Sequence, residues 1–188
     1  VRFNLESENI TGIKLLNTTN ITVFNMTMDL KGNDITAIDI TKTSKTNITS
    51  NNITINAKNE DKKAIIFNNT EETIVTNNTI MTTAKYTINV DKKSSKSNIQ
   101  DNLLYALNLG DSSVIDESNN YIRITNNKPT VSYLNLLLND NTYSAFFDEN
   151  GVLRDEIPTS ANITVVGNIY DKTINITRPV NIMTQIAG

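Results

Sequence analysis

The chain has 188 residues and a net charge of −3, and it contains neither cysteine nor histidine. The charge gives no reason to expect a nucleic-acid partner, and the missing residue types exclude disulfides, thiolate metal sites and histidine acid–base chemistry, so we expect neither a cofactor nor a metal site. Asparagine, threonine and isoleucine number 31, 26 and 25, a composition that favours strands and turns over helices.

Residues 1–127 contain a repeat built from two alternating series of β-rich segments. The first series includes TNITVFNMTM (19–28) and TNITSNNITI (46–55), and its anchors are Ile21, Ile48, Ile74, Ile99 and Ile122. The second series includes ITAIDI (35–40), and its anchors are Ile13, Ile38, Ile65, Ile88 and Leu109. Subtraction of residue numbers gives spacings between 21 and 27 residues, so one structural unit is repeated about five times.

This period is too short for ankyrin, tetratricopeptide or propeller repeats, and the signature of leucine-rich repeats is absent. We therefore predict an all-β fold, a right-handed parallel β-helix in which each unit is one coil of a β-solenoid. Strand alternation places Ile48, Ile53 and Ile55 inward and Thr49 and Thr54 outward. Like residues of successive coils then stack, each contacting only its neighbours above and below.

Asparagine marks the breaks between strands. Its side chain tolerates left-handed backbone, and stacked amides can hydrogen-bond from coil to coil. The candidates for one such ladder are Asn52, Asn78 and Asn102. Plain turn propensity without a ladder is the alternative.

The pattern changes after residue 127, and residues 128–188 are expected to form a linker, a short helix and the entrance coil of a further β-helix unit. Tyr143, Phe146 and Phe147 are spaced for one capping helix near 141–149. Asn141 or Thr142 would cap this helix, and Gly151 would end it.

Ten Asn-x-Thr sequons offer glycan acceptors if the protein is exported, although a chain rich in Asn and Thr also produces them by chance. The candidates for modification are Asn20, Asn47 and Asn162.

The segment DENG (148–151) could bind calcium, but we expect it to end the helix instead, since its spacing fits no complete calcium-binding loop. One aromatic residue per coil is expected to serve the core or a coil edge rather than a sugar-stacking stripe: Phe24, Phe67, Tyr86, Tyr105 and Tyr121.

The coils resemble the parallel β-helix repeats of the adhesin-like surface proteins of methanogenic archaea. The more specific similarity lies in residues 141–182, which run from a Tyr/Phe helix through DENG and IP to RPVNI (178–182). In that family this entrance segment precedes the coils, whereas here it follows them. The resemblance implies an extracellular, cell-surface location and attachment to glycans or other cell surfaces.

The permuted order indicates that this chain is one unit of a longer array, either covalent or assembled from copies of itself. Residues 159–188 of one unit would stack on residues 1–30 of the next, and the alternative is a fragment whose boundaries carry no meaning. The candidate stacking residues are Val1, Phe3, Ile13, Ile174, Ile176, Val180 and Ile182. Such a head-to-tail contact does not close, so it builds a filament.

We therefore expect a structural, adhesin-like protein that is not an enzyme, with no membrane span in this chain. A pectin-lyase-like enzyme that degrades polysaccharides is the alternative, because many such enzymes share the β-helix. Catalysis would need two carboxylates in one cleft. Asp34 and Asp39 could face a common side, but no second coil supplies aspartates at equivalent positions.

Overall fold

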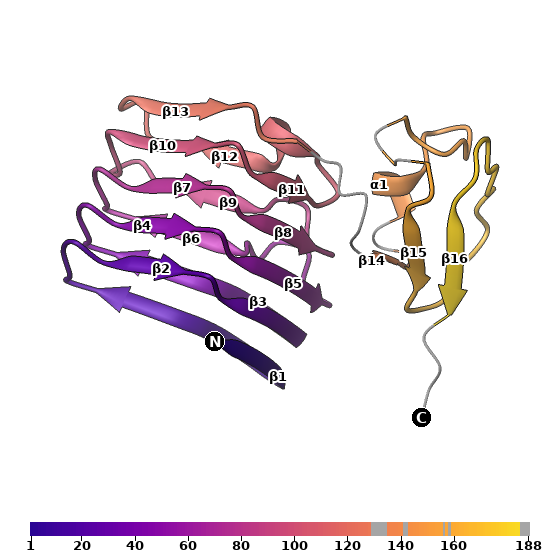
Figure 1. Ribbon diagram of the computed structural model, residues 1–188, viewed down its shortest axis with the longest axis horizontal. Coiled ribbons are helices and arrows are strands. Elements are labelled where there is room, and N and C mark those ends of the chain that lie inside the picture. Colours follow the sequence, from indigo (N-terminus) through magenta and orange to yellow (C-terminus); the bar gives the residue numbers. More distant parts are fainter. Residues whose placement is uncertain (129–134, 141–142, 156, 158, 185–188) are drawn as a thin grey trace.

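The computed structural model describes residues 1–128, 135–140, 143–155, 157 and 159–184. The chain winds into a stack of coils, and a smaller three-stranded unit lies beside this stack (Figure 1). All the paired strands run parallel, and their partners come from neighbouring coils. The predicted parallel β-solenoid is confirmed, and its right-handedness stays a prediction.

Three sheets contain the strands. The first sheet contains β1 (Arg2–Leu16), β3 (Thr27–Thr41), β5 (Asn52–Ala57), β6 (Ile65–Asn68), β8 (Thr79–Thr82), β9 (Ile88–Val90), β11 (Leu103–Tyr105) and β12 (Val114–Asp116). The second contains β2 (Thr22–Phe24), β4 (Asn47–Thr49), β7 (Ile74–Thr76), β10 (Ser97–Gln100) and β13 (Ile122–Thr125). The third contains β14 (Asn135–Leu138), β15 (Asn162–Val165) and β16 (Asn181–Thr184). A 3-10 turn, η1 (Gly110–Ser113), precedes β12, and the helix α1 (Tyr143–Phe146) precedes β15.

The core consists of vertical files of aliphatic side chains. The file of the second sheet is Val23, Ile48, Val75, Ile99 and Ile124. A file of the first sheet is Ile13, Ile38, Ile65, Ile88 and Val114. In the middle coils the side chains of both files are fully buried. The predicted inward positions of Ile48, Ile53 and Ile55 are confirmed, and Thr49 and Thr54 face outward.

Four of the ten predicted anchors are wrong. Ile21, Ile74 and Ile122 lie one or two residues before the file positions, which Val23, Val75 and Ile124 occupy. Because neighbouring strand residues point to opposite faces, this slip leaves Ile74 42% exposed. Leu109 lies outside its file, where Val114 pairs with Ile88.

A ladder of buried amides, Asn51, Asn78, Asn102 and Asn127, runs along one corner of the stack. Each Nδ2 donates to the Oδ1 of the next asparagine over 2.8–3.0 Å. The same Oδ1 accepts the main-chain N–H of the preceding asparagine over 2.9–3.2 Å. Asp111 ends the ladder, because its Oδ1 accepts both donors of Asn127, over 2.9 and 2.7 Å.

The predicted ladder is therefore confirmed at Asn78 and Asn102 and wrong at Asn52. Asn51 forms the hydrogen bonds to Asn78 in this coil, whereas Asn52 is the first residue of β5. The residues just before the four rungs, together with Asn25 one coil earlier, have left-handed backbone with φ of 52–57°, and they form a column: Asn25, Ser50, Asn77, Asp101 and Asn126. Only three of these five are asparagine, so the corner geometry also imposes left-handed backbone on Ser and Asp.

A second core joins the C-terminal unit to the coil stack. Phe146 and Phe147 are buried here, and the ring of Phe146 meets that of Tyr105 edge-on at 5.6 Å. Helix α1 is shorter than the predicted helix, because the Asp148 side chain accepts the main-chain N–H of Asn150 and Val152, each over 2.9 Å, and turns the chain. The predicted cap at 141–142 lies outside the described residues. Gly151, with φ +75°, belongs to this turn.

Candidate assembly and binding surfaces

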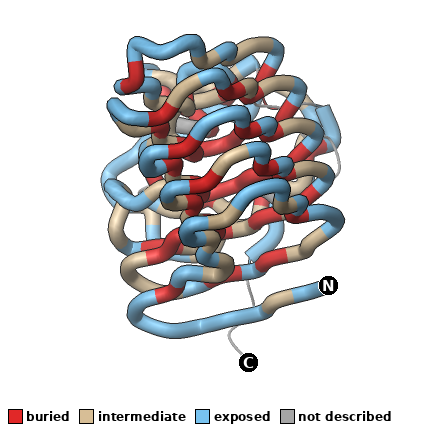
Figure 2. The backbone as a smooth tube through the Cα atoms, turned by 90° about the vertical axis from the view of Figure 1, so that its left-hand side faces the viewer, coloured by how far each residue is buried: buried red, intermediate tan, exposed pale blue. Residues whose placement is uncertain are grey.

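The N-terminal end of the stack leaves one layer of the core half-covered. Phe3 and Ile13 on β1 are partly buried, whereas Met28 and Ile38, their partners on β3, are 1% and 0% exposed. Figure 2 shows this contrast, with buried residues in the middle coils and a largely exposed first coil. A further coil placed against β1 would give its side chains the burial that β3 already has.

The backbone of β1 is open along the same side. It is an edge strand of 15 residues, and among the described residues it pairs with β3 alone. Alternate residues of a parallel edge strand direct their N–H and C=O groups away from the sheet. The edge therefore offers both hydrogen bonds and apolar surface to an additional parallel strand, and Val1, which immediately precedes β1, is 81% exposed.

Within the described residues, β16 is a second edge strand, at one side of the three-stranded sheet. β16 pairs with β15, and Ile182 is 50% exposed although its partner Ile163 is completely buried. Val180 is partly buried against the second core. Ile174 and Ile176 lie outside the strands and are 46% and 38% exposed. Of the predicted stacking residues, Phe3 and Ile13 lie on the edge strand β1 and Ile182 lies on the edge strand β16, and stacking itself stays a prediction.

The candidate glycan acceptors differ in their surroundings. Asn20 lies at a left-handed corner, Asn47 begins β4, and both side chains are exposed. Asn162 lies within β15, where its Oδ1 accepts the Asn181 side-chain amide over 3.1 Å. Asn20 and Asn47 are therefore the more accessible, and whether any of the three carries a glycan stays a prediction.

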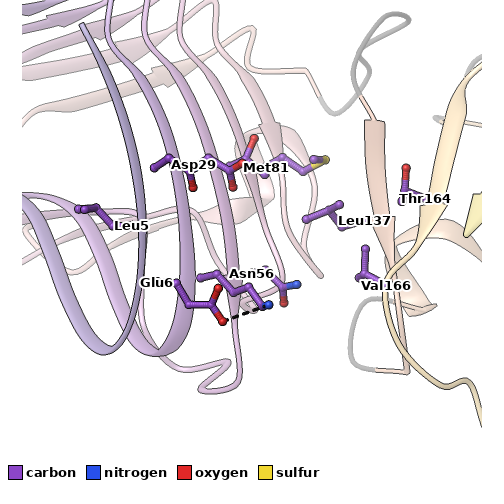
Figure 3. A pocket seen from close by; sticks show the side chains of 11 residues that line it. Leu5, Glu6, Asp29, Asn56, Met81, Leu137, Thr164 and Val166 are labelled. Atoms are coloured by element: carbon purple, nitrogen blue, oxygen red, sulfur yellow. Dashed lines mark ion pairs between the residues drawn. The ribbon is translucent and has the colours of Figure 1, made fainter. Parts of the chain in front are cut away.

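A groove of about 520 Å³ separates the outer face of the first sheet from the C-terminal unit (Figure 3). Its floor has two columns of side chains, Asn4, Asp29 and Thr54 in one and Glu6, Lys31 and Asn56 in the other. Its far wall carries Leu137, Thr164 and Val166. Lys31 Nζ and Glu6 Oε1 are 3.2 Å apart. We call this cavity the sheet-face groove.

Asp34 and Asp39, the carboxylates considered for catalysis, and the further carboxylate Asp61 each have a structural partner. Asp39 Oδ1 accepts the hydroxyl of Thr41 over 2.8 Å, and Asp34 accepts the side-chain amide of Asn59. A hydrogen bond from Lys85 lowers the pKa of Asp61. Within the described part of the chain, no three acidic side chains gather as a metal site.

The aromatic residues form no stripe. Phe67 and Tyr105 are buried, while Phe24 and Tyr121 are 58% and 93% exposed. Tyr86 lies between these extremes. The expectation of core aromatics is therefore confirmed for Phe67 and Tyr105 and wrong for Phe24 and Tyr121, whose side chains are largely exposed.

Comparison with known protein families, with curated proteins and with solved structures finds no match for this chain. Among the described residues, no helix is long and apolar enough to cross a membrane. Sequence reasoning missed the sheet-face groove and the role of Asp111, because both depend on segments that are distant in the sequence.

Proposed function

We propose that this chain is a structural unit of an extracellular, adhesin-like surface protein, and that its units stack end to end in a fibre or tandem array. The observation that carries the proposal is the half-covered core layer on β1, directly beside the fully covered layer on β3. The similarity to the surface proteins of methanogenic archaea supports the cell-surface location.

The direction of the strands favours a contact between β1 of one unit and a different edge strand of the next unit. Two β1 edges related by a two-fold axis would meet antiparallel, whereas the coils continue only through parallel pairs. The edge of β16 is the unlike partner within the same chain, and its aliphatic Ile182 matches the aliphatic layer on β1. A contact of this kind leaves an open edge on every new unit, so it propagates.

The expected affinity of one junction is modest. Completing the burial of a half-covered aliphatic side chain contributes about 1 kcal/mol, and only a few such side chains meet at each end. Association must first offset about 4–15 kcal/mol of lost translational and rotational freedom. Experiments on the separate unit therefore need high protein concentration, and covalent linkage in a tandem chain would remove most of this cost.

Two complementary variants test the proposal. Ile13→Lys places a charge in the half-covered core layer on β1, and Ile182→Lys places a charge on β16. Each variant alone is expected to remain monomeric in light scattering, because its charge would be buried without a partner in the junction. An equimolar mixture is expected to form dimers and nothing longer, because only one pair of intact edges remains.

Leu16→Lys is the matched control, since Leu16 lies on the same strand, is 50% exposed and points away from the core. This variant should assemble as the wild type does. A wild-type chain that stays monomeric at high concentration, together with native material that contains no ordered array, would refute the proposal.

The pectin-lyase-like alternative makes a different prediction. Acidic polysaccharides would be cleaved, with or without calcium, and one Asp substitution would abolish the turnover. We expect no turnover in either condition.

A further inference from the structure

We propose that the sheet-face groove binds a neutral oligosaccharide. This goes beyond end-to-end stacking, because the groove lies on the outer face of the first sheet rather than on its edge (Figure 3). Its volume, about 520 Å³, lies within the range of about 300–1,000 Å³ typical of ligand pockets.

The charges of the floor select against anionic ligands. Lys31 and Glu6 form an ion pair at 3.2 Å, so their opposite charges offset each other on the floor. Asp29 forms no ion pair within the described part of the chain, so one carboxylate remains in excess. Polyuronates and nucleic acids, which carry a negative charge on every unit, are therefore disfavoured.

The two walls of the groove differ in chemistry. The floor presents the amides of Asn4 and Asn56 and the hydroxyl of Thr54, which both donate and accept hydrogen bonds. The opposite wall presents the aliphatic side chains of Leu137 and Val166. A saccharide has hydroxyl groups around its ring and C–H groups on its faces, so it complements both walls at once.

One polar atom of the apolar wall has no partner within the described part of the protein. Thr164 Oγ1 is buried and has no hydrogen-bond partner among the described residues. A buried hydroxyl without a partner is uncommon and costly. Because Oγ1 is closed off from solvent, a ligand hydroxyl would pair with it only after the Thr164 side chain rotates toward the groove.

The floor also determines how an extended ligand would lie. Asn4, Asp29 and Thr54 occupy the same register position on β1, β3 and β5. Adjacent parallel strands are about 4.8 Å apart, so these side chains repeat along the coil axis. An oligosaccharide is expected to cross the strands along this column rather than to follow one strand.

The test is titration of the full 188-residue chain, in the Ile13→Lys background that prevents stacking. The probes are cellohexaose, mannohexaose and chitohexaose, with oligogalacturonate as the anionic comparison. We expect at least one neutral hexasaccharide to bind and to shift the amide NMR signals of β3, β5 and β15. Oligogalacturonate should not bind the wild-type groove.

Thr54→Trp fills the groove and is expected to weaken binding about tenfold or more, whereas Thr76→Trp, on the outer face of β7, is the matched control and should bind normally. Asp29→Lys removes the excess negative charge and should allow oligogalacturonate to bind. If none of the neutral probes binds, or if Thr54→Trp binds as tightly as Thr76→Trp, the proposed site is wrong. Neither result depends on whether units stack, because the Ile13→Lys background prevents assembly.

Discussion

Removal of one rung of the amide ladder, Asn78→Ala, is expected to destabilise the fold strongly. Asn78 Oδ1 accepts the main-chain N–H and the side-chain amide of Asn51, each over 2.9 Å. Truncation leaves the main-chain N–H of Asn51 without an acceptor and its side-chain amide with Val23 O alone, and each lost bond of a buried donor costs about 1–3 kcal/mol. It also removes the bonds that Asn78 Nδ2 donates to Ile48 O and Asn102 Oδ1, over 2.9 and 3.0 Å.

We therefore expect Asn78→Ala to lower the free energy of unfolding by about 3–5 kcal/mol, out of a total of about 5–15 kcal/mol for a domain. Urea denaturation followed by circular dichroism measures this difference. Asn98→Ala is the control, because Asn98 lies on β10 and its Oδ1 has no partner among the described residues. A loss below about 1 kcal/mol, equal to that of the control, would mean that the ladder does not stabilise the stack.

Three further predictions concern particular side chains. Gly32→Ala should prevent stable folding or cost about 3 kcal/mol or more, because its Cβ would lie 1.7 Å from Ser7 O, whereas Gly167→Ala, with 3.2 Å to Asn139 Cβ, should melt near the wild-type temperature. Equal melting temperatures for these two variants would contradict the register of β1 on β3. Asp111→Ala should cost about 1–3 kcal/mol in urea denaturation, because the main-chain N–H of Asn127 loses its acceptor and its side-chain amide keeps Ile99 O alone, and Asp111→Asn should restore most of this loss. Failure of the Asn variant to do so would contradict Asp111 as the end of the ladder. Lys85→Gln should raise the pKa of Asp61, read by NMR titration, toward its ordinary value of 3.8. Since that pKa is lowered in the folded chain, the contribution of the pair is present at neutral pH and is lost as the pH falls through the lowered value. An unchanged Asp61 titration would show that the two groups do not interact in solution.

The fold could be predicted because its period is repeated along the chain. Ile13, Ile38, Ile65 and Ile88 are spaced by one coil each, and the structure places all four in one file. Asn78 and Asn102 could be predicted as rungs because each follows a strand at the same position in its coil.

The errors arise where two similar residues are adjacent. Ile74 and Val75 are both β-branched, and only the pairing of Val75 with Ile48 and Ile99 determines which one points inward. Asn51 and Asn52 present the same ambiguity, which the backbone of β5 resolves.

The binding surfaces could be predicted only in part. The stacking candidates Phe3, Ile13 and Ile182 follow from the apolar pattern near the two ends of the chain, although their partial exposure does not. The sheet-face groove is lined by both Asn4 and Thr164, which are separated by most of the chain, so no local sequence pattern could predict it. The same is true of Asp111, which reaches Asn127 from a separate turn.

Electron cryomicroscopy of the native assembly tests the stacking of coils most directly. At a resolution that separates strands about 4.8 Å apart, we expect the coil of one unit to be followed without a gap by β1 of the next, in parallel. The outer edge of β1 would then be paired and its side chains fully buried. Native particles in which that edge faces solvent, or in which two β1 strands meet antiparallel, would contradict this account.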